Sequence, residues 1–213
     1  GNACVLRGGS EAIHSNKAIA AVLSEAVEKA GAPAGAISFI DRTEREVVVE
    51  LLKQDHYIDV IIPRGGESLM KLVTEESRIP VIKHDKGVCH IYIDADADVA
   101  MATSIATNAK VQRPSTCNAM ETLLVHQSSA RAVLPDLVGE LMKSGVEVRG
   151  CAKTLSLCPE VKPADESDYG QEFLSLILAV KVVRNIEEAM EHIARYGSRH
   201  TEAIITQDYG RAM

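Results

Sequence analysis

Short apolar runs rich in β-branched residues alternate with helical segments along most of the chain. Residues 16–29 place Ala, Ile, Val and Leu on one face at helical spacing, whereas 58–62 and 176–183 are continuous apolar runs. Strands that alternate with helices at this spacing need crossover connections, and crossovers join parallel strands. The sequence therefore predicts an α/β protein built on mostly parallel sheets.

The same patterns give bounds for each expected element. Strands are expected at 3–6, 36–40, 58–62, 80–83, 90–93, 120–126, 146–149, 176–183 and 203–206, and helices at 16–29, 43–53, 67–75, 96–109, 128–144 and 185–196. The first strand is expected to be buried. Thr43 and Glu46 form a capping-box pattern, and Asn185 is positioned as a helix cap. Residues 158–171 have the composition of a loop.

Bulk properties exclude several classes of protein. The net charge of −7 disfavours a nucleic-acid binder, and no apolar run reaches the length of a membrane helix. Five cysteines, an odd number without a CxxC pair, indicate a reducing compartment, so we expect a cytoplasmic protein. The chain opens almost directly on a strand and stops in the first turn of a helix. We therefore expect a piece of a longer protein, truncated at both ends.

Cys117 is the residue with the most unusual surroundings. It lies in QRPSTCNAME, residues 112–121, among polar and turn-forming residues, whereas cysteine more often lies in apolar runs. A thiolate is the reactive form of cysteine and cations favour it, and Arg113 lies four residues upstream. The sequence leaves two readings open, a presented reactive thiol and a buried structural cysteine.

Two corners of similar sequence follow expected strands. Arg7-Gly8-Gly9-Ser10 and Pro63-Arg64-Gly65-Gly66 each lead from a strand towards a helix. Glycines there let backbone N–H groups approach a phosphate, and a helix N-terminus favours an anion. Such corners lie at the carboxyl ends of parallel strands, where open α/β sheets bind ligands. An ordinary strand-to-helix turn is the alternative reading of each.

Other chemistry-bearing residues are less distinctive. Candidate bases for Cys117 in a Cys–His hydrolase are His84, His90, His126 and His200. The acidic run at 94–98 lacks the central Gly and the distant Glu of a calcium loop, so a solvated turn with a helix cap is expected, and no metal site.

Six stretches of the chain carry a resemblance to a known family. They are GNACVLRGGSEAIHSN (1–16), IDVIIPRGGESL (58–69), HDKGVCHIYIDADAD (84–98), NAKVQRPSTCNAMETLLVH (108–126), LILAVKVV (176–183) and RYGSRHTEAIITQD (195–208). Taken together, these stretches resemble the gamma-glutamyl phosphate reductases, a branch of the aldehyde dehydrogenase superfamily. The resemblance covers essentially the whole chain and is most specific in its central block. The family is roughly twice as long, so the chain resembles its middle half.

The resemblance implies a fold and an activity. Residues 1–84 would be part of an NADP-binding domain, and 85–213 part of a catalytic domain. The family reduces L-glutamyl 5-phosphate to glutamate 5-semialdehyde with NADPH and releases phosphate, in the synthesis of proline. Cys117 matches the nucleophile that forms a thioester, and its own backbone N–H is one candidate donor to the oxyanion. The full-length protein would form a homo-oligomer.

The resemblance also assigns residues to the cofactor and the substrate. It places the phosphates and adenosine of NADPH or NADP at Arg7, Ser10, Arg64, Gly65 and Gly66. Glu172 matches the residue that holds the nicotinamide ribose; without the resemblance it reads as a surface carboxylate.

For the substrate phosphate or carboxylate we expect Arg113, Arg199 and His200. His84 stands where oxidising members of the superfamily carry a general-base Glu, which fits a route without thioester hydrolysis. The alternatives are an aldehyde dehydrogenase of another substrate class, a Cys–His hydrolase, and a non-catalytic binding domain.

Overall fold

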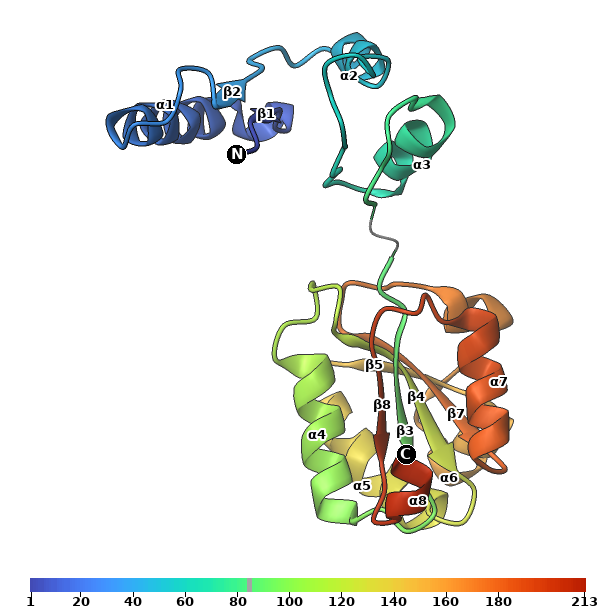
Figure 1. The fold of residues 1–213 in the computed structure, drawn as a ribbon. Coiled ribbons are helices and arrows are strands. Elements are labelled where there is room, and N and C mark those ends of the chain that lie inside the picture. Colours follow the sequence, from blue (N-terminus) through green and yellow to red (C-terminus); the bar gives the residue numbers. More distant parts are fainter. Residues whose placement is uncertain (84–85) are drawn as a thin grey trace. The chain divides into compact units, whose positions relative to one another are not determined.

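The computed structural model describes residues 1–83 and 86–213, and the chain divides into two compact units, Gly1–His84 and Asp85–Met213 (Figure 1). Each unit contains its own parallel sheet, with two strands in the first and six in the second. The predicted α/β class with parallel strands is confirmed.

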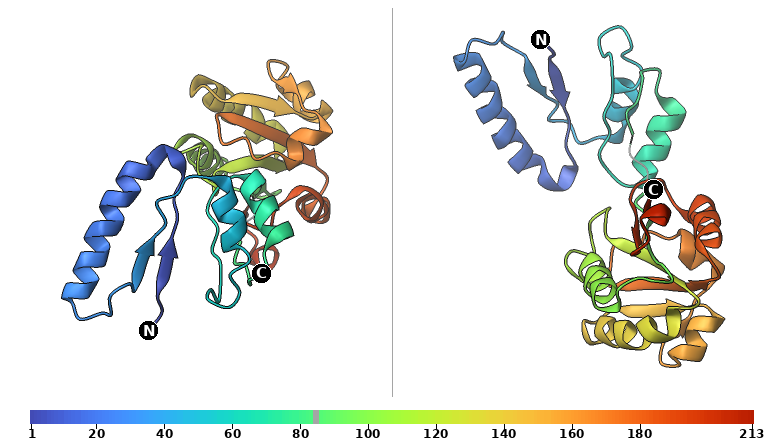
Figure 2. Two further views of the ribbon diagram at one scale, coloured as in Figure 1. Left: turned by 90° about the horizontal axis from the view of Figure 1, so that it is seen from above. Right: turned by 60° about the horizontal axis from the view of Figure 1, so that its bottom comes forward.

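The first unit begins with a strand–helix–strand crossover. Strands β1 and β2 pair in parallel, and α1 runs beside them (Figure 2). Helix α1 ends before Gly31, whose φ of +94° is a left-handed conformation that glycine adopts at little cost. The elements of this unit are β1 (Cys4–Leu6), the 3₁₀ turn η1 (Ser10–Ala12), α1 (Ile13–Lys29), β2 (Ile37–Phe39), α2 (Arg45–Leu51) and α3 (Glu67–Glu76).

Two expectations for the first unit are wrong. The predicted strands 58–62 and 80–83 reduce to one bridge between Ile61 and Val81, because strand formation depends on cross-strand pairing more than on β-branched composition. The capping box is also absent. Helix α2 begins after Glu44 without a side-chain cap, and the carbonyl of Thr43 accepts a hydrogen bond from Arg7 instead.

Much of the apolar surface of the first unit is exposed. Strand β1 was expected to be buried, yet Val5 is 53% exposed. Helix α1 carries Ile19, Val22 and Leu23 on its surface, and Ala20 is its one buried residue. The apolar periodicity therefore predicted the helix correctly, but the described residues do not cover its apolar face.

The second unit is a six-stranded parallel sheet with strand order β6-β5-β7-β4-β3-β8. In Figure 1, α4 and α7 lie on opposite sides of this sheet. The elements are β3 (Cys89–Ile93), α4 (Val99–Val111), β4 (Met120–His126), α5 (Ala130–Lys143), β5 (Glu147–Gly150), α6 (Ala152–Leu157), β6 (Lys162–Pro163), the 3₁₀ helix η2 (Glu166–Gly170), β7 (Ile177–Val183), α7 (Ile186–Tyr196), β8 (Glu202–Ile205) and α8 (Tyr209–Ala212).

Side-chain caps are present at the start of three of these α-helices, α4, α7 and α8. The Asn185 side chain accepts a hydrogen bond from the N–H of Glu188, which confirms the cap expected for α7. Asp98 caps α4 in the same way, as the acidic run predicted.

The expectation of a solvated turn is wrong for Asp94, which is 1% exposed and accepts hydrogen bonds from Tyr92, Thr206 and Arg211. The loop expected at 158–171 contains β6 and η2.

The main hydrophobic core lies between the sheet and helices α4 and α5. A smaller hydrophobic cluster lies between the sheet and α7. Helix α5 supplies Val133, Leu134, Leu137, Val138 and Leu141, all of them fully buried. No helix in residues 1–83 and 86–213 combines the length and the apolar character needed to cross a bilayer.

We expect Leu137→Ala to lower the free energy of unfolding of this chain by about 2–5 kcal/mol, because it leaves a cavity in the α5 layer. Leu137 is 0% exposed, whereas Met142 on the same helix is 40% exposed. Urea unfolding followed by circular dichroism measures both variants. Met142→Ala is the control, with an expected loss below about 1 kcal/mol. Equal losses in the two variants would contradict the assigned core.

Candidate active site

Four chain segments meet at one edge of the large sheet. Strands β7, β4, β3 and β8 are consecutive neighbours and all run in parallel. Because parallel strands begin at the same edge, the segments that precede them are brought together there. These segments are 86–88, 112–119, 171–176 and 197–201. The four contain Cys117, Glu172, Arg113, Arg199 and His200.

Cys117 lies in a turn between α4 and β4, and it is exposed. The carbonyl of Arg113 accepts hydrogen bonds from both the N–H and the Oγ1 of Thr116, at 3.2 and 2.8 Å. The carbonyl of Thr116 in turn accepts from Ala119 at 3.0 Å. The proline and hydroxyl residues before the cysteine thus form a hydrogen-bonded turn, and the exposed position excludes the buried-cysteine reading.

The backbone of Cys117 rests on the segment that leads into β3. The Cys89 thiol donates to the Cys117 carbonyl at 3.1 Å, and burial raises the pKa of Cys89 to about 11. Cys89 therefore remains a protonated donor at neutral pH. Gly87 faces the same carbonyl so closely that a methyl group there would overlap the oxygen.

The Glu172 side chain binds the main chain of the segment that contacts Cys117. Its Oε1 accepts a hydrogen bond from the N–H of Gly87 at 2.8 Å. On the other side, the Ser198 hydroxyl accepts from the N–H of Val88 at 2.9 Å. The His200 Nδ1 lies 3.8 Å from the Cys89 sulfur and 2.9 Å from Thr201 Oγ1. Glu172 and His200 therefore approach the Cys117 turn through the 87–89 segment.

Two residues near this edge have left-handed backbone conformations. Among the described residues, Leu174 with φ +51° and Arg199 with φ +60° are the non-glycine positions of this kind. Such conformations cost free energy in residues with side chains and persist where the surrounding structure fixes them. Both residues lie in the converging segments, and strained backbone conformations of this kind cluster at functional sites, so their location favours a functional site at this edge.

The other predicted bases lie elsewhere or outside the described residues. His90 is buried on the α7 side of the sheet, with its ring 5.6 Å from that of His192. His126 ends β4 at the opposite edge and contacts Ser128. His84, the position proposed for the general-base match, lies outside the described residues.

The predicted cofactor residues of the first unit lie at two corners. Arg7 follows β1, and its Nη2 donates to the carbonyl of Thr43 at 2.9 Å. The Nε of Arg7 is buried without a hydrogen-bond partner among the described residues. Arg7 and Gly8 line a hollow of about 210 Å³ beside α1. Ser10 is exposed and begins η1.

At the second corner, Arg64, Gly65 and Gly66 are exposed. Gly66 precedes the first residue of α3, and its carbonyl accepts from Leu69 and Met70. The expected strand before this corner is only a bridge. The predicted strand–corner–helix pattern is therefore complete at Arg7 but only partly formed at Arg64.

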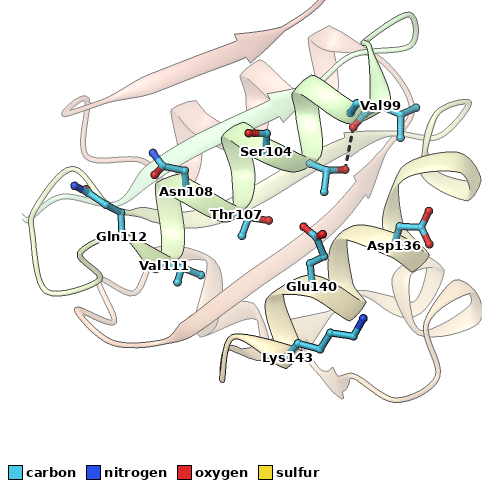
Figure 3. Close-up of a pocket in the computed structure, with 11 residues that line it drawn as sticks. Val99, Ser104, Thr107, Asn108, Val111, Gln112, Asp136, Glu140 and Lys143 are labelled. Atoms are coloured by element: carbon cyan, nitrogen blue, oxygen red, sulfur yellow. Dashed lines mark hydrogen bonds between the residues drawn. The ribbon is translucent and has the colours of Figure 1, made fainter.

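A separate groove of about 1070 Å³ lies between α4 and α5 (Figure 3). Its walls carry Ser104, Thr107 and Asn108 on α4, and Asp136 and Glu140 on α5. None of the predicted site residues lines it. The groove therefore lacks the predicted site residues, although its lining includes Gln112, the first residue of the segment that carries Cys117.

Comparison with known proteins identifies the family. The family model described as "Aldehyde dehydrogenase family" matches residues 1–165. The chain belongs to the aldehyde dehydrogenase family. This assignment confirms the aldehyde-dehydrogenase-like α/β fold expected from the sequence.

Within this family, the chain resembles curated proteins named gamma-glutamyl phosphate reductase. It is 54% identical over 213 residues to the one from Thermodesulfovibrio yellowstonii and 56% identical over 209 residues to the one from Geobacter metallireducens. It covers 51% and 50% of these proteins, so it spans about half of their length. These matches confirm the resemblance that the sequence motifs indicated.

Solved structures of related proteins have the same fold as this chain. The crystal structure of gamma-glutamyl phosphate reductase from Thermotoga maritima matches 98% of this chain with a TM-score of 0.94 and 46% identity, and the match covers 50% of that protein. An acetylating aldehyde dehydrogenase from Geobacillus thermoglucosidasius, 24% identical, matches 98% of the chain and 54% of its own length with a TM-score of 0.72. The second likeness concerns the fold alone.

Sequence reasoning missed several residues at this edge. Gly87 and Cys89 contact the Cys117 carbonyl, and Lys110 forms a buried ion pair with Glu121 near the same turn. Gly87 and Cys89 lie in the matching stretch 84–98, but no local pattern around them assigns them a role. Lys110 and Glu121 lie on different elements, and no pattern in the sequence pairs them.

Proposed function

We propose that this chain is part of a cytoplasmic reductase that converts L-glutamyl 5-phosphate to glutamate 5-semialdehyde in proline synthesis, with NADPH as the reductant and phosphate as a product. The first unit is part of the NADP-binding domain, and the second is part of the catalytic domain. The observation that carries the proposal is the exposed Cys117, held by its backbone at the edge where four segments meet. The proposed substrate is taken from the names of the curated relatives, which are 54% and 56% identical to this chain.

Cys117 acts as the nucleophile in this proposal. Its thiolate attacks the acyl carbon, the carbon–oxygen bond to the phosphate breaks, and phosphate leaves with the bonding electron pair. A thioester on Cys117 remains. The N–H of Cys117 donates to no acceptor among the described residues. It is therefore free to stabilise the oxyanion that forms beside the sulfur.

When bound, NADPH would supply the hydride that adds to the thioester carbon. The hemithioacetal on Cys117 then collapses: its carbon–sulfur bond breaks, the electron pair returns to the sulfur, and glutamate 5-semialdehyde leaves. In the first unit, Arg7, Ser10, Arg64, Gly65 and Gly66 would hold its phosphates and adenosine. Arg7 fits this role because a buried N–H without an acceptor is costly, and an anionic oxygen would satisfy it.

In the second unit, Glu172 would hold the nicotinamide ribose. Its Oε1 accepts one hydrogen bond, from the N–H of Gly87, and a carboxylate has capacity to accept further bonds from the ribose hydroxyls.

Arg113, Arg199 and His200 would bind the anionic groups of the substrate. Both arginines are exposed, and Arg113 belongs to the same hydrogen-bonded turn as Cys117. Guanidinium groups bind phosphate and carboxylate through paired hydrogen bonds. We also propose that the full-length protein is a homo-oligomer, as the resemblance implies.

A Cys–His hydrolase has less support. No histidine in the described part of the chain is hydrogen-bonded to the Cys117 sulfur, and the Nδ1 of His200 lies near Thr201 Oγ1 and the Cys89 sulfur. An acyl-phosphate reductase needs no base to activate water for thioester hydrolysis.

The function is tested in the reverse direction with the full-length protein that carries this chain. Glutamate semialdehyde, NADP⁺ and inorganic phosphate are supplied, and NADPH formation is followed at 340 nm. We expect formation that requires phosphate, because phosphate releases the acyl group from the thioester. Formation that is independent of phosphate would indicate a hydrolysing aldehyde dehydrogenase, and hydrolysis of an acyl substrate without nicotinamide would indicate the hydrolase.

A further inference from the structure

A fully buried ion pair flanks the turn that carries Cys117. The Lys110 Nζ lies 2.6 Å from the Glu121 Oε2, and the two side chains are 0% and 1% exposed. Lys110 lies in the last turn of α4, and Glu121 is the second residue of β4. The pair therefore joins the two ends of the connection that contains Cys117.

The same carboxylate reaches a third segment. The Glu121 Oε1 accepts a hydrogen bond from the N–H of Leu174 at 3.1 Å. Leu174 has the left-handed φ of +51° and is 45% exposed. The hydrogen bond to Glu121 fixes a backbone that is otherwise disfavoured.

Phe173 adds a second connection. Its ring centroid lies 6.0 Å from the Lys110 Nζ and 5.4 Å from the Arg149 guanidinium carbon. A cation over an aromatic ring is attracted by the ring electrons. Residues 173 and 174 are thus both linked to the buried pair, and the residue just before them is Glu172.

A continuous series of contacts connects Glu121 to the Cys117 carbonyl. Glu121 holds Leu174, Glu172 holds the N–H of Gly87, and Gly87 packs against the Cys117 carbonyl. The chain from Cys117 to Glu121 completes the circuit. The position of Glu172 relative to Cys117 therefore depends on the contact between Glu121 and Leu174.

Stability alone does not account for such a pair. Burial lowers the pKa of Lys110 and raises the pKa of Glu121, because removing either charge from water is unfavourable. Apolar residues of similar volume can often replace a buried ion pair without loss of stability. An apolar residue at 121, however, would leave the N–H of Leu174 without an acceptor.

We propose that the Lys110–Glu121 pair is a positioning device that fixes Glu172 relative to Cys117 through the hydrogen bond from Leu174 to Glu121. The inference rests on the proposed function, in which Glu172 holds the nicotinamide ribose and Cys117 carries the acyl group. Lys110 orients the carboxylate so that its second oxygen points to Leu174.

Two double variants of the full-length protein separate positioning from stability. Lys110→Met/Glu121→Leu removes the charges and the acceptor for Leu174, whereas Lys110→Met/Glu121→Gln removes the charges and keeps an acceptor. For the first we expect kcat to fall about 10²-fold, as for a reacting group displaced by about 1 Å, with KM for glutamate semialdehyde nearly unchanged. The glutamine variant should recover most of this loss.

Affinity for NADP⁺, measured by titration calorimetry, is a readout independent of turnover. We expect the Kd to rise about tenfold in the leucine variant and to stay within about threefold in the glutamine variant, because Glu172 is displaced only in the former. Wild-type kcat and Kd in a folded leucine variant would overturn the proposal. Where wild type itself shows no phosphate-dependent NADPH formation, the proposed function fails, and the Kd comparison still decides the positioning role.

Two further measurements guard against a purely structural effect. Arg211→Met breaks the ion pair with Asp94, a 2.9 Å contact whose carboxylate is 2% exposed. It should lower the melting temperature without changing kcat or the Kd for NADP⁺. In wild type, the amide hydrogen of Leu174 should exchange slowly with solvent although its side chain is exposed. Rapid exchange of that amide would overturn the proposal even where the leucine variant does not fold.

Discussion

Cys117→Ser in the full-length protein is expected to lower kcat for phosphate-dependent NADPH formation by about 10⁴-fold or more. Serine keeps the size and the turn geometry, but its hydroxyl is a poor nucleophile without an adjacent base. No histidine among the described residues is hydrogen-bonded to this position, so nothing in that part of the chain would activate the new hydroxyl. The melting temperature should not change, because the side chain is exposed.

Cys4→Ser is the matched control, since Cys4 is also exposed and lies in β1. It should retain wild-type kcat. Mass spectrometry of wild type mixed with the acyl phosphate, without NADPH, should detect an acyl adduct on Cys117 that is absent from the Cys117→Ser variant. An adduct on another cysteine, or a serine variant that retains a tenth of the activity, would remove Cys117 from the role of nucleophile.

The parallel architecture could be predicted from the sequence because hydrophobic periodicity records it directly. The strand at 120–126 agrees with β4 residue for residue, and Asn185 caps α7 as expected. The strand at 58–62 failed because its apolar composition carries no information about a partner, and only Ile61 finds one. Local sequence thus predicts elements well where the sheet is complete. It predicts them poorly where the formation of a strand depends on whether a pairing partner is present.

The site could be predicted only in part, for a related reason. Cys117 has a local signal, a cysteine among turn-forming residues, and the resemblance gives it a role. Gly87 and Cys89 have no such signal, because their importance depends on which strands are neighbours. The sequence does not show that β3 lies beside β4, yet that adjacency brings Gly87 under the Cys117 carbonyl.

Gly87→Ala is expected to lower kcat about 10²-fold, because it displaces the nucleophile while keeping its chemistry. A methyl group at position 87 would overlap the Cys117 carbonyl oxygen and lie 2.8 Å from its carbonyl carbon. Both atoms belong to the main chain, so no side-chain rotation relieves the overlap and the Cys117 turn has to move. The displacement also disturbs the hydrogen bond from the N–H of Gly87 to Glu172.

Gly139→Ala is the control, since no atom beyond its chain neighbours and the nearby backbone of its own helix lies within 4 Å of the position that its methyl group would occupy. It lies inside α5, where alanine is favoured over glycine by about 1 kcal/mol, so stability should rise slightly and kcat should be unchanged. Steady-state kinetics and the rate of Cys117 alkylation by iodoacetamide measure both variants. If Gly87→Ala keeps wild-type kcat, the contact between Gly87 and the Cys117 carbonyl does not set the position of the sulfur. A loss of kcat with unchanged stability would instead mean that the absence of one side chain fixes where the nucleophile lies.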